Sequence, residues 1–217
     1  MEFDFNLVLD IAPKLLEGLS MTLQLSVLSI VIGGIFGVLL GMFRVSDVLP
    51  ALQIFVKGYV YFMRGTPLLV QIYMVFFLLP RMGVTLSPYW TGVAALSAHS
   101  AAYICEITRS AVGSIAAGQV EAAVSIGMTR FQTLAIIQLP QAAKRMVPPL
   151  TNELASSIKN TSLLSVIAVF ELTKSANSII QRDFIFFEVL FVVALYYLIM
   201  VQIVTAVANF FENKVFK

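Results

Sequence analysis

Five long apolar runs, separated by short polar stretches, make up most of the chain. A helix that crosses the hydrocarbon core of a bilayer needs roughly 20 mostly apolar residues, and every run reaches that length. We therefore predict an all-α polytopic membrane protein with five transmembrane helices, at roughly residues 19–43, 52–79, 89–112, 147–170 and 186–211. Neither a linker nor an internal repeat interrupts the pattern, so residues 1–217 are expected to form a single membrane domain.

The charges between the runs predict an orientation. Five spans place the termini on opposite sides of the membrane, and Lys and Arg favour the cytoplasmic side. The N-terminal tail and the second and fourth connections hold Lys14, Arg81, Lys174 and Arg182. The opposite side holds Arg44, Arg130, Lys144, Arg145, Lys214 and Lys217. We therefore expect the N-terminus outside and the C-terminus in the cytoplasm, with a short surface helix within residues 3–17.

Composition supports the membrane assignment and excludes other classes. The chain is 59% hydrophobic and only 12% charged, whereas a soluble domain carries about 25% charged residues. A net charge of +2 with no basic run argues against nucleic acid, and the single Cys105 excludes an internal disulfide. In the first run Gly33, Gly37 and Gly41 recur every fourth residue, and we expect another helix to pack closely against them.

A mildly amphipathic insert, residues 114–145, separates the third and fourth runs on the predicted cytoplasmic side. Residues 119–126 are typical of a short helix, with Glu121 in a first turn that favours a carboxylate. Ala122 and Ala123 keep one of its faces small, and Gly127 fits the C-terminal cap. This half of the insert is either an ordinary surface loop or a docking element for another protein.

The second half of the insert predicts another short helix. Thr129 and Gln132 have the spacing of a capping box at its start. We expect the pair Leu139-Pro140 to end this helix, because proline cannot continue the hydrogen-bond ladder. The insert would then consist of two short helices joined by a glycine hinge at the cytoplasmic surface.

The second run carries Arg64-Gly65-Thr66-Pro67 in its interior. Pro67 removes a backbone donor and predicts a kink, while Gly65 lets another backbone come near. Arg64 needs a partner at this depth, either a carboxylate or carbonyl groups at a helix end. A structural kink and a gating element both remain open.

Polar side chains also interrupt the third and fourth runs. Ionisable groups inside a membrane are costly and usually face a cavity. His99 lies near the middle of the third run, and Lys159 lies at similar depth in the fourth. Glu153 and Asn160 are seven residues apart, which places them on one helix face. We expect a binding site where these two runs meet.

The insert resembles the EAA loop of ABC importer permeases. The residues that match its spacing are Glu121, Ala122, Ala123, Gly127, Ile137, Leu139 and Pro140. The similarity to the polar amino acid permeases extends over nearly the whole chain. It includes Thr22–Ser26, Arg64–Gln71, Ala102–Ile104 with Glu106, Gly118-Gln119, Asn152-Glu153 and Lys159–Leu163. The resemblance implies the type I importer fold in a bacterial inner membrane. It also implies a permease dimer with two ATP-binding subunits below and an external amino acid-binding protein above.

The absence of certain motifs agrees with that division of labour. The sequence contains no Gly-x-x-x-x-Gly-Lys-Ser/Thr phosphate loop, no His/Cys metal-ligand spacing and no Gly-x-Ser-x-Gly elbow. We therefore expect a non-catalytic subunit with no metal or cofactor of its own. ATP and magnesium are expected on the partner ATPase.

The leading hypothesis is a permease for amino acids, polar and possibly basic, that couples ATP hydrolysis on a partner to alternating access. Glu153 would pair with the ammonium group of the cargo, and Asn160, Thr161, Ser162 or free backbone amides would hold its carboxylate. Lys159 and His99 are further candidates. Alternatively, Glu153 and Lys159 only satisfy charges at the dimer seam and bind no cargo. In that case His99 is a packed, hydrogen-bonded neutral imidazole.

The competing hypothesis is an ion-driven secondary amino acid transporter, with Glu106 and Glu153 as carboxylates for the coupling ion. Five spans without an inverted repeat argue against it. A homodimer and a heterodimer of permeases both remain open.

Overall fold

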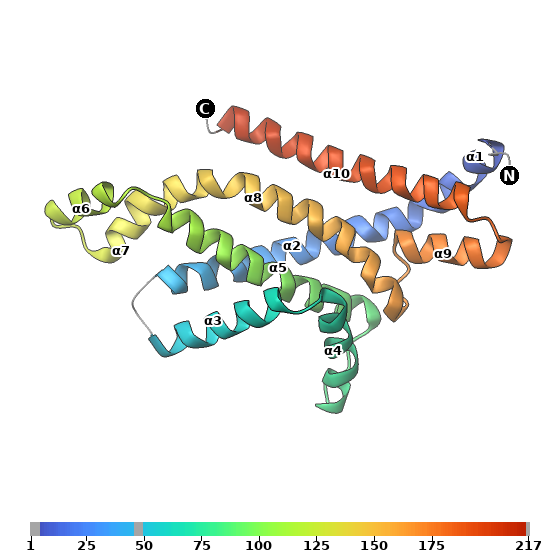
Figure 1. The fold of residues 1–217 in the computed structure, drawn as a ribbon, viewed down its shortest axis with the longest axis horizontal. Coiled ribbons are helices and arrows are strands. Elements are labelled where there is room, and N and C mark those ends of the chain that lie inside the picture. Colours follow the sequence, from blue (N-terminus) through green and yellow to red (C-terminus); the bar gives the residue numbers. More distant parts are fainter. Residues whose placement is uncertain (1–4, 46–49, 216–217) are drawn as a thin grey trace.

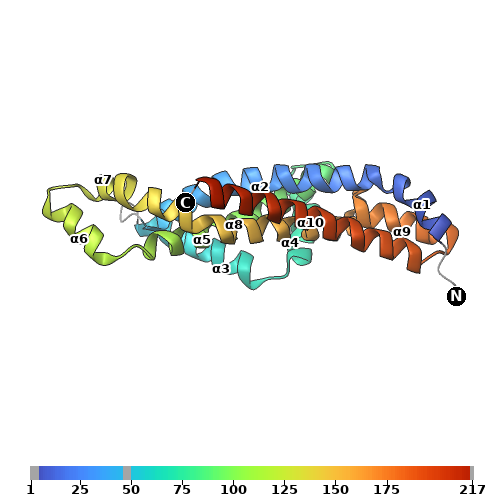
Figure 2. The same cartoon turned by 90° about the horizontal axis from the view of Figure 1, so that it is seen from above.

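The computed structural model describes residues 5–45 and 50–215, and this part of the chain contains helices and turns but no strand. Figures 1 and 2 show an elongated bundle with α6 and α7 at one end and α1 and α9 at the other. The helices are α1 (Phe5–Lys14), α2 (Leu16–Val45), α3 (Pro50–Gly65), α4 (Leu68–Arg81), α5 (Pro88–Gly113), α6 (Ala117–Ser125), α7 (Arg130–Gln132), the π-helix η1 (Thr133–Gln138), α8 (Leu139–Asn160), the 3-10 helix η2 (Thr161–Ile167), α9 (Leu172–Asp183) and α10 (Phe187–Val215).

Helix α5 is the centre of the bundle, and α2 packs along it through the expected glycine stripe. A Cβ atom added to Gly37 would lie 2.8 Å from the carbonyl oxygen of Ala101, and one added to Gly41 would lie 2.5 Å from Cβ of Thr108. Both distances are shorter than real carbon contacts, so a larger residue cannot fit. The predicted close packing of this stripe is confirmed.

The run at residues 52–79 does not form one continuous helix. The chain forms α3 and α4 instead, and their axes differ by 112°. Pro67 lacks the N–H that a continuous helix needs, and it also disfavours helical geometry at Thr66. The break lies in the segment where a kink was expected, but the turn is far sharper than a kink. Figure 1 shows α4 projecting sideways from the bundle.

Leu139-Pro140 does not end a helix, so the expected end of the second short helix of the insert is wrong. The helical path continues from α7 through η1 into α8 and η2. Pro140 lies in the first turn of α8, directly after the π-helix. The wider turn of a π-helix removes the contact between the proline ring and the carbonyl four residues earlier, which normally breaks a helix. The helix that contains the start of the fourth run therefore begins at Leu139, and α9 follows at 49°.

Two of the helices, α2 and α10, are long and apolar enough to cross a bilayer alone. Each of the bent pairs, α3 with α4 and the path of residues 130–167 with α9, meets the same test when taken together. Large apolar side chains are exposed along the outer faces of α2 and α10, among them Ile35, Leu198 and Ile203. Such a surface is stable in lipid and costly in water.

Candidate functional site

The seam between α5 and α8 holds the buried carboxylate of Glu153. Ser100 Oγ on α5 donates a hydrogen bond of 2.8 Å to Glu153 Oε1, and only 9% of Glu153 is exposed. One turn further along α8, the buried Ser157 hydroxyl has no hydrogen-bond partner among the described residues. Unpaired buried polar groups are uncommon, so Glu153 and Ser157 are the candidate ligand-binding groups of this seam.

The other residues expected at this site lie where α8 changes into the 3-10 helix η2. Thr161 Oγ1 donates to the carbonyl of Ile158 and Ser162 Oγ donates to the carbonyl of Lys159, each at 2.7 Å. Lys159 is exposed and Asn160 is half-buried. The helix tightens here rather than unwinding, so both hydroxyls keep only their acceptor lone pairs for a ligand.

His99 belongs to a different network, at the elbow between α3 and α4. Its Nδ1–H donates to Gln71 Oε1 at 2.9 Å. The Gln71 amide group donates to the carbonyl oxygens of Met63 (2.8 Å) and Thr66 (3.1 Å), and to Thr66 Oγ1 (2.9 Å). Because Pro67 cannot donate to the Met63 carbonyl, the Gln71 side chain replaces the missing backbone hydrogen bond. This geometry favours the packed imidazole for His99.

Arg64 meets an aromatic ring instead of a carboxylate. Its guanidinium carbon lies 5.4 Å from the ring centroid of Tyr103 on α5, a distance typical of a cation–π contact. The Tyr103 ring in turn lies 4.8 Å from the imidazole of His99. Two hollows of about 830 Å³ and 320 Å³ share Arg64, Tyr103 and Glu106 along one side of α5. Gly65, expected to admit another backbone, is exposed and has open space beside it.

Glu106 is held between two guanidinium groups. Arg44 Nη1 on α2 lies 2.5 Å from Glu106 Oε2, and Arg109 Nε donates to Oε1 at 2.9 Å. A carboxylate paired with two permanent cations stays ionised and is a poor carrier for a coupling proton. The ion-driven hypothesis therefore loses one of its two carboxylates.

The insert at the end of the bundle has the caps that the sequence predicts. Helix α6 ends next to Gly127, which adopts a positive φ of +82°. The Gly127 N–H donates to the Val124 carbonyl at 2.9 Å and so caps the last turn of the helix. Thr129 and Gln132 form a complete capping box, with bonds of 2.8 Å and 3.3 Å. Glu121 is exposed, but it lies in the second turn of α6 because the helix begins at Ala117 rather than at residue 119.

Hydrogen bonds tie α6 and the end of α5 to α8, the helix that leads from the insert into the bundle. Gln141 donates to Gln119 Oε1 at 2.5 Å, and Arg145 donates to the carbonyl oxygen of Ser114 at 2.5 Å. Ala123 is only 3% exposed, so it packs inside the insert, whereas Ala122 is exposed. Large apolar side chains are exposed on the insert: Val124, Ile126, Phe131 and Ile136. A protruding, anchored element with exposed apolar side chains is suited to protein contact.

Comparison with known proteins identifies the family. Residues 19–217 match the model of the family described as binding-protein-dependent transport system inner membrane component. The chain belongs to this family. It is therefore an inner-membrane permease of a binding-protein-dependent importer, which is the class that the resemblance implied.

Individual relatives agree over the whole length. The permease is 37% identical over 216 residues to the glutamine transport system permease protein GlnP of Escherichia coli K12, covering 99% of this chain and 98% of that protein. It is 34% identical over 215 residues to the arginine transport system permease protein ArtQ of Bacillus subtilis 168, with the same coverage. A crystal structure of an amino acid ABC transporter with histidines superposes with a TM-score of 0.91 at 32% identity, covering 99% of the permease and 100% of that chain.

Sequence reasoning missed several residues that organise these sites. Gln71 gave a local signal, because it follows Pro67 by four residues and can reach the carbonyl that proline leaves free. Ser100 stands beside His99 but was not singled out. Arg44 gave no signal of its partner, because Glu106 is 62 residues away. Among the described residues no three His, Cys, Asp or Glu side chains gather as a metal site.

Proposed function

We propose that this permease carries polar amino acids inward, and that its insert receives the force of ATP hydrolysis from partner subunits. The observation that carries the proposal is the geometry of the insert. It protrudes beyond the bundle (Figure 1) and exposes Glu121 and Ile126. Gln141 ties its helix α6 to α8, and Arg145 ties the end of α5 to α8. The names of the relatives, which transport glutamine and arginine, support the amino acid class.

The proposed topology has five crossings. They are α2, the elbow pair α3–α4, the central helix α5, the path of α8 and η2, and α10. The two ends of the described chain lie at opposite ends of the bundle in Figure 1, which supports an odd number of crossings. With the positive-inside direction, α1 and α9 are outside, and the insert and the end of α10 are in the cytoplasm.

The proposed partners are two ATP-binding subunits below the membrane, which hold ATP and magnesium, and an external amino acid-binding protein above it. A second permease copy completes the pathway, and this subunit itself hydrolyses no ATP. Movement of α6 passes into η1, which α6 contacts, and from η1 into α8; it passes from α8 into the end of α5 through the Arg145–Ser114 contact. The two helices that receive the movement are those that hold Glu153 and Ser100.

For the cargo we propose Glu153 as the acceptor for the ammonium group. The amide of Asn160 and the ammonium of Lys159 are the donors proposed around its carboxylate. Thr161 and Ser162 would join them by turning their hydroxyl hydrogens from the carbonyls of Ile158 and Lys159 to the cargo. The sequence pointed to a possibly basic amino acid because two carboxylates and one lysine were expected near the cavity. Because Arg44 and Arg109 neutralise Glu106, that expectation is not retained, and the proposed class is polar amino acids.

The coupling role is tested in the complete complex reconstituted in proteoliposomes. Gly127 adopts φ +82°, where a β-branched residue is strained by roughly 1–2 kcal/mol. Gly127→Val should reshape the α6 C-terminus, and Glu121→Arg should reverse the charge of its exposed face. Both variants should assemble and lose uptake while ATP hydrolysis continues. Normal uptake by both variants rules out this role for the insert.

A further inference from the structure

A hollow of about 320 Å³ lies along the seam of α5 and α8, on the insert side of the Glu153–Ser100 hydrogen bond. Tyr103 lines this seam hollow on α5, three residues after Ser100, and Pro149 lines it on α8, four residues before Glu153. Both positions are about one helical turn from the hydrogen bond, on the side that the proposed orientation places toward the cytoplasm. The hollow extends to Ser114, where α5 ends. A cargo that leaves Glu153 inward would therefore enter it.

Arg64 lines the seam hollow and also the adjoining hollow of about 830 Å³. Its side chain is exposed, and it forms no ion pair with any carboxylate that the structure describes. The carboxylate that lines both hollows, Glu106, is already held by Arg44 and Arg109. A cation inside a membrane span is unfavourable without a counter-ion. Arg64 therefore has the capacity to bind an anionic group that enters the seam hollow.

The ring of Tyr103 positions this guanidinium. The guanidinium carbon of Arg64 lies 5.4 Å from the ring centroid, and the ring itself packs at 4.8 Å against His99, which is bonded to Gln71. A cation–π contact uses no N–H group as a hydrogen-bond donor, so the donors of Arg64 remain available. A guanidinium binds a planar carboxylate with two parallel hydrogen bonds. Arg64 is therefore a preorganised carboxylate-binding group.

The other cations of the two hollows are less suited to this role. Arg145 also lines the seam hollow, but it already donates to the carbonyl oxygen of Ser114. Lys57 lines only the larger hollow, away from the seam. Arg64 is the group that combines a free guanidinium with a place beside Tyr103.

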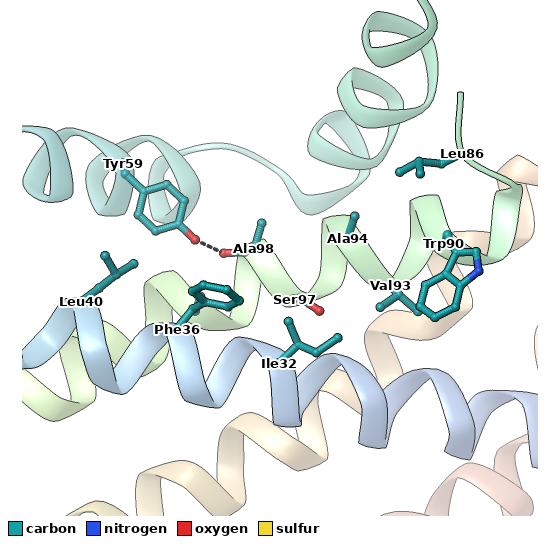
Figure 3. A pocket seen from close by; sticks show the side chains of 11 residues that line it. Ile32, Phe36, Leu40, Tyr59, Leu86, Trp90, Val93, Ala94, Ser97 and Ala98 are labelled. Atoms are coloured by element: carbon teal, nitrogen blue, oxygen red, sulfur yellow. Dashed lines mark hydrogen bonds between the residues drawn. The ribbon is translucent and has the colours of Figure 1, made fainter. Parts of the chain in front are cut away.

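A third hollow, of about 520 Å³, lies between α2, α3 and α5, and no charged residue lines it. Figure 3 shows apolar side chains such as Phe36 and Trp90 around it, and the Tyr59 hydroxyl there already donates to the carbonyl of Ala98. A zwitterion would lose its hydration in such a hollow without gaining a charged partner. The charged seam hollow is therefore the better path for an amino acid.

We propose that Arg64 is a further cargo-binding residue, whose guanidinium holds the carboxylate of the amino acid on the cytoplasmic side of Glu153 as the cargo leaves the permease. Tyr103 is its positioning residue. Every amino acid carries this carboxylate, so the contact serves cargo of any side chain. The inference rests on the proposed function, but the choice of Arg64 rests on the seam hollow, the free guanidinium and the ring beneath it.

Binding of an amino acid and of its α-carboxamide, in which an uncharged amide replaces the carboxylate, tests this role. The amino acid is the one that the unmodified complex imports fastest in proteoliposomes. Its affinity and that of its carboxamide are measured by equilibrium dialysis on the complete complex without nucleotide. The variants are Arg64→Gln and Arg64→Lys. The matched control is Lys57→Gln, which removes a positive charge from the same helix but away from the seam hollow.

We expect Arg64→Gln to weaken binding of the amino acid about tenfold or more and binding of the carboxamide about twofold at most, because only the carboxylate forms a charge-assisted hydrogen bond. Arg64→Lys keeps the charge but loses the planar fork, so its loss should fall between these values. Lys57→Gln should leave the ratio of the two affinities unchanged.

Three results overturn the inference and leave the proposed function intact. Equal losses for the amino acid and its carboxamide in Arg64→Gln show that Arg64 only supports the elbow. The same change of ratio in Lys57→Gln shows that the general positive potential of the hollows attracts the cargo. Where Arg64→Gln does not assemble, an unchanged ratio in Arg64→Lys is decisive. An unmodified complex that imports none of the common amino acids contradicts both the inference and the proposed function.

Discussion

Replacing Gln71 by Leu removes the side chain that holds the elbow between α3 and α4. The substitution leaves the Met63 carbonyl without the donor that stands in for the missing Pro67 N–H, and it leaves His99 Nδ1–H without its acceptor. The Gln71 amide provides two donors and one acceptor to this network. Interhelical side-chain hydrogen bonds in membranes contribute about 0.6 kcal/mol on average, so three of them give about 2 kcal/mol.

The free energy of unfolding measured in mixed micelles by denaturant titration checks this figure. Gln71→Glu is the matched control, because a carboxylate still accepts from His99 but cannot donate to the Met63 and Thr66 carbonyls. We expect Gln71→Leu to lose about 2 kcal/mol and Gln71→Glu to be destabilised as well. A Gln71→Leu permease within about 0.5 kcal/mol of the unmodified one, the range of an ordinary surface change, refutes the role of this network.

Three further expectations follow from other contacts. Glu153→Gln should weaken the apparent affinity for the cargo in uptake and in cargo-stimulated ATPase assays; an unchanged affinity removes Glu153 from the site. Gly41→Val should prevent close α2–α5 packing and reduce the yield of folded complex, because its Cβ would lie 2.5 Å from Cβ of Thr108. The control Gly34→Val should be neutral, because no atom lies within 4 Å of a Cβ added there. Glu106→Gln should lower the midpoint of thermal unfolding, because Arg44 and Arg109 lose their negatively charged partner; equal midpoints contradict this.

The features that the sequence predicts well are local ones. Gly127 and the pair Thr129 and Gln132 lie next to the backbone groups that they cap, so their roles follow from spacing alone. The glycine stripe on α2 is also readable, because small residues on one face permit close packing whatever the partner is.

Features that depend on geometry between distant segments were not predictable. Pro67 predicts that the helix is interrupted. The angle of 112° between α3 and α4 depends in addition on Gln71 and His99, which the sequence does not place together. Pro140 was expected to stop a helix, and the π-helix before it permits the chain to continue. From their similar depth in the membrane, the third and fourth runs were expected to meet at His99 and Lys159. In the structure the hydrogen bond between these runs joins Ser100 to Glu153.

The coupling of uptake to ATP hydrolysis through the insert is the central claim, and the number of amino acid molecules imported per ATP hydrolysed tests it most directly. The measurement is made on proteoliposomes that contain the complete complex, with the unmodified permease and with Glu121→Arg. We expect Glu121→Arg to bring this ratio close to zero while ATP hydrolysis continues. An unchanged ratio contradicts the claim that the exposed face of α6 receives the force.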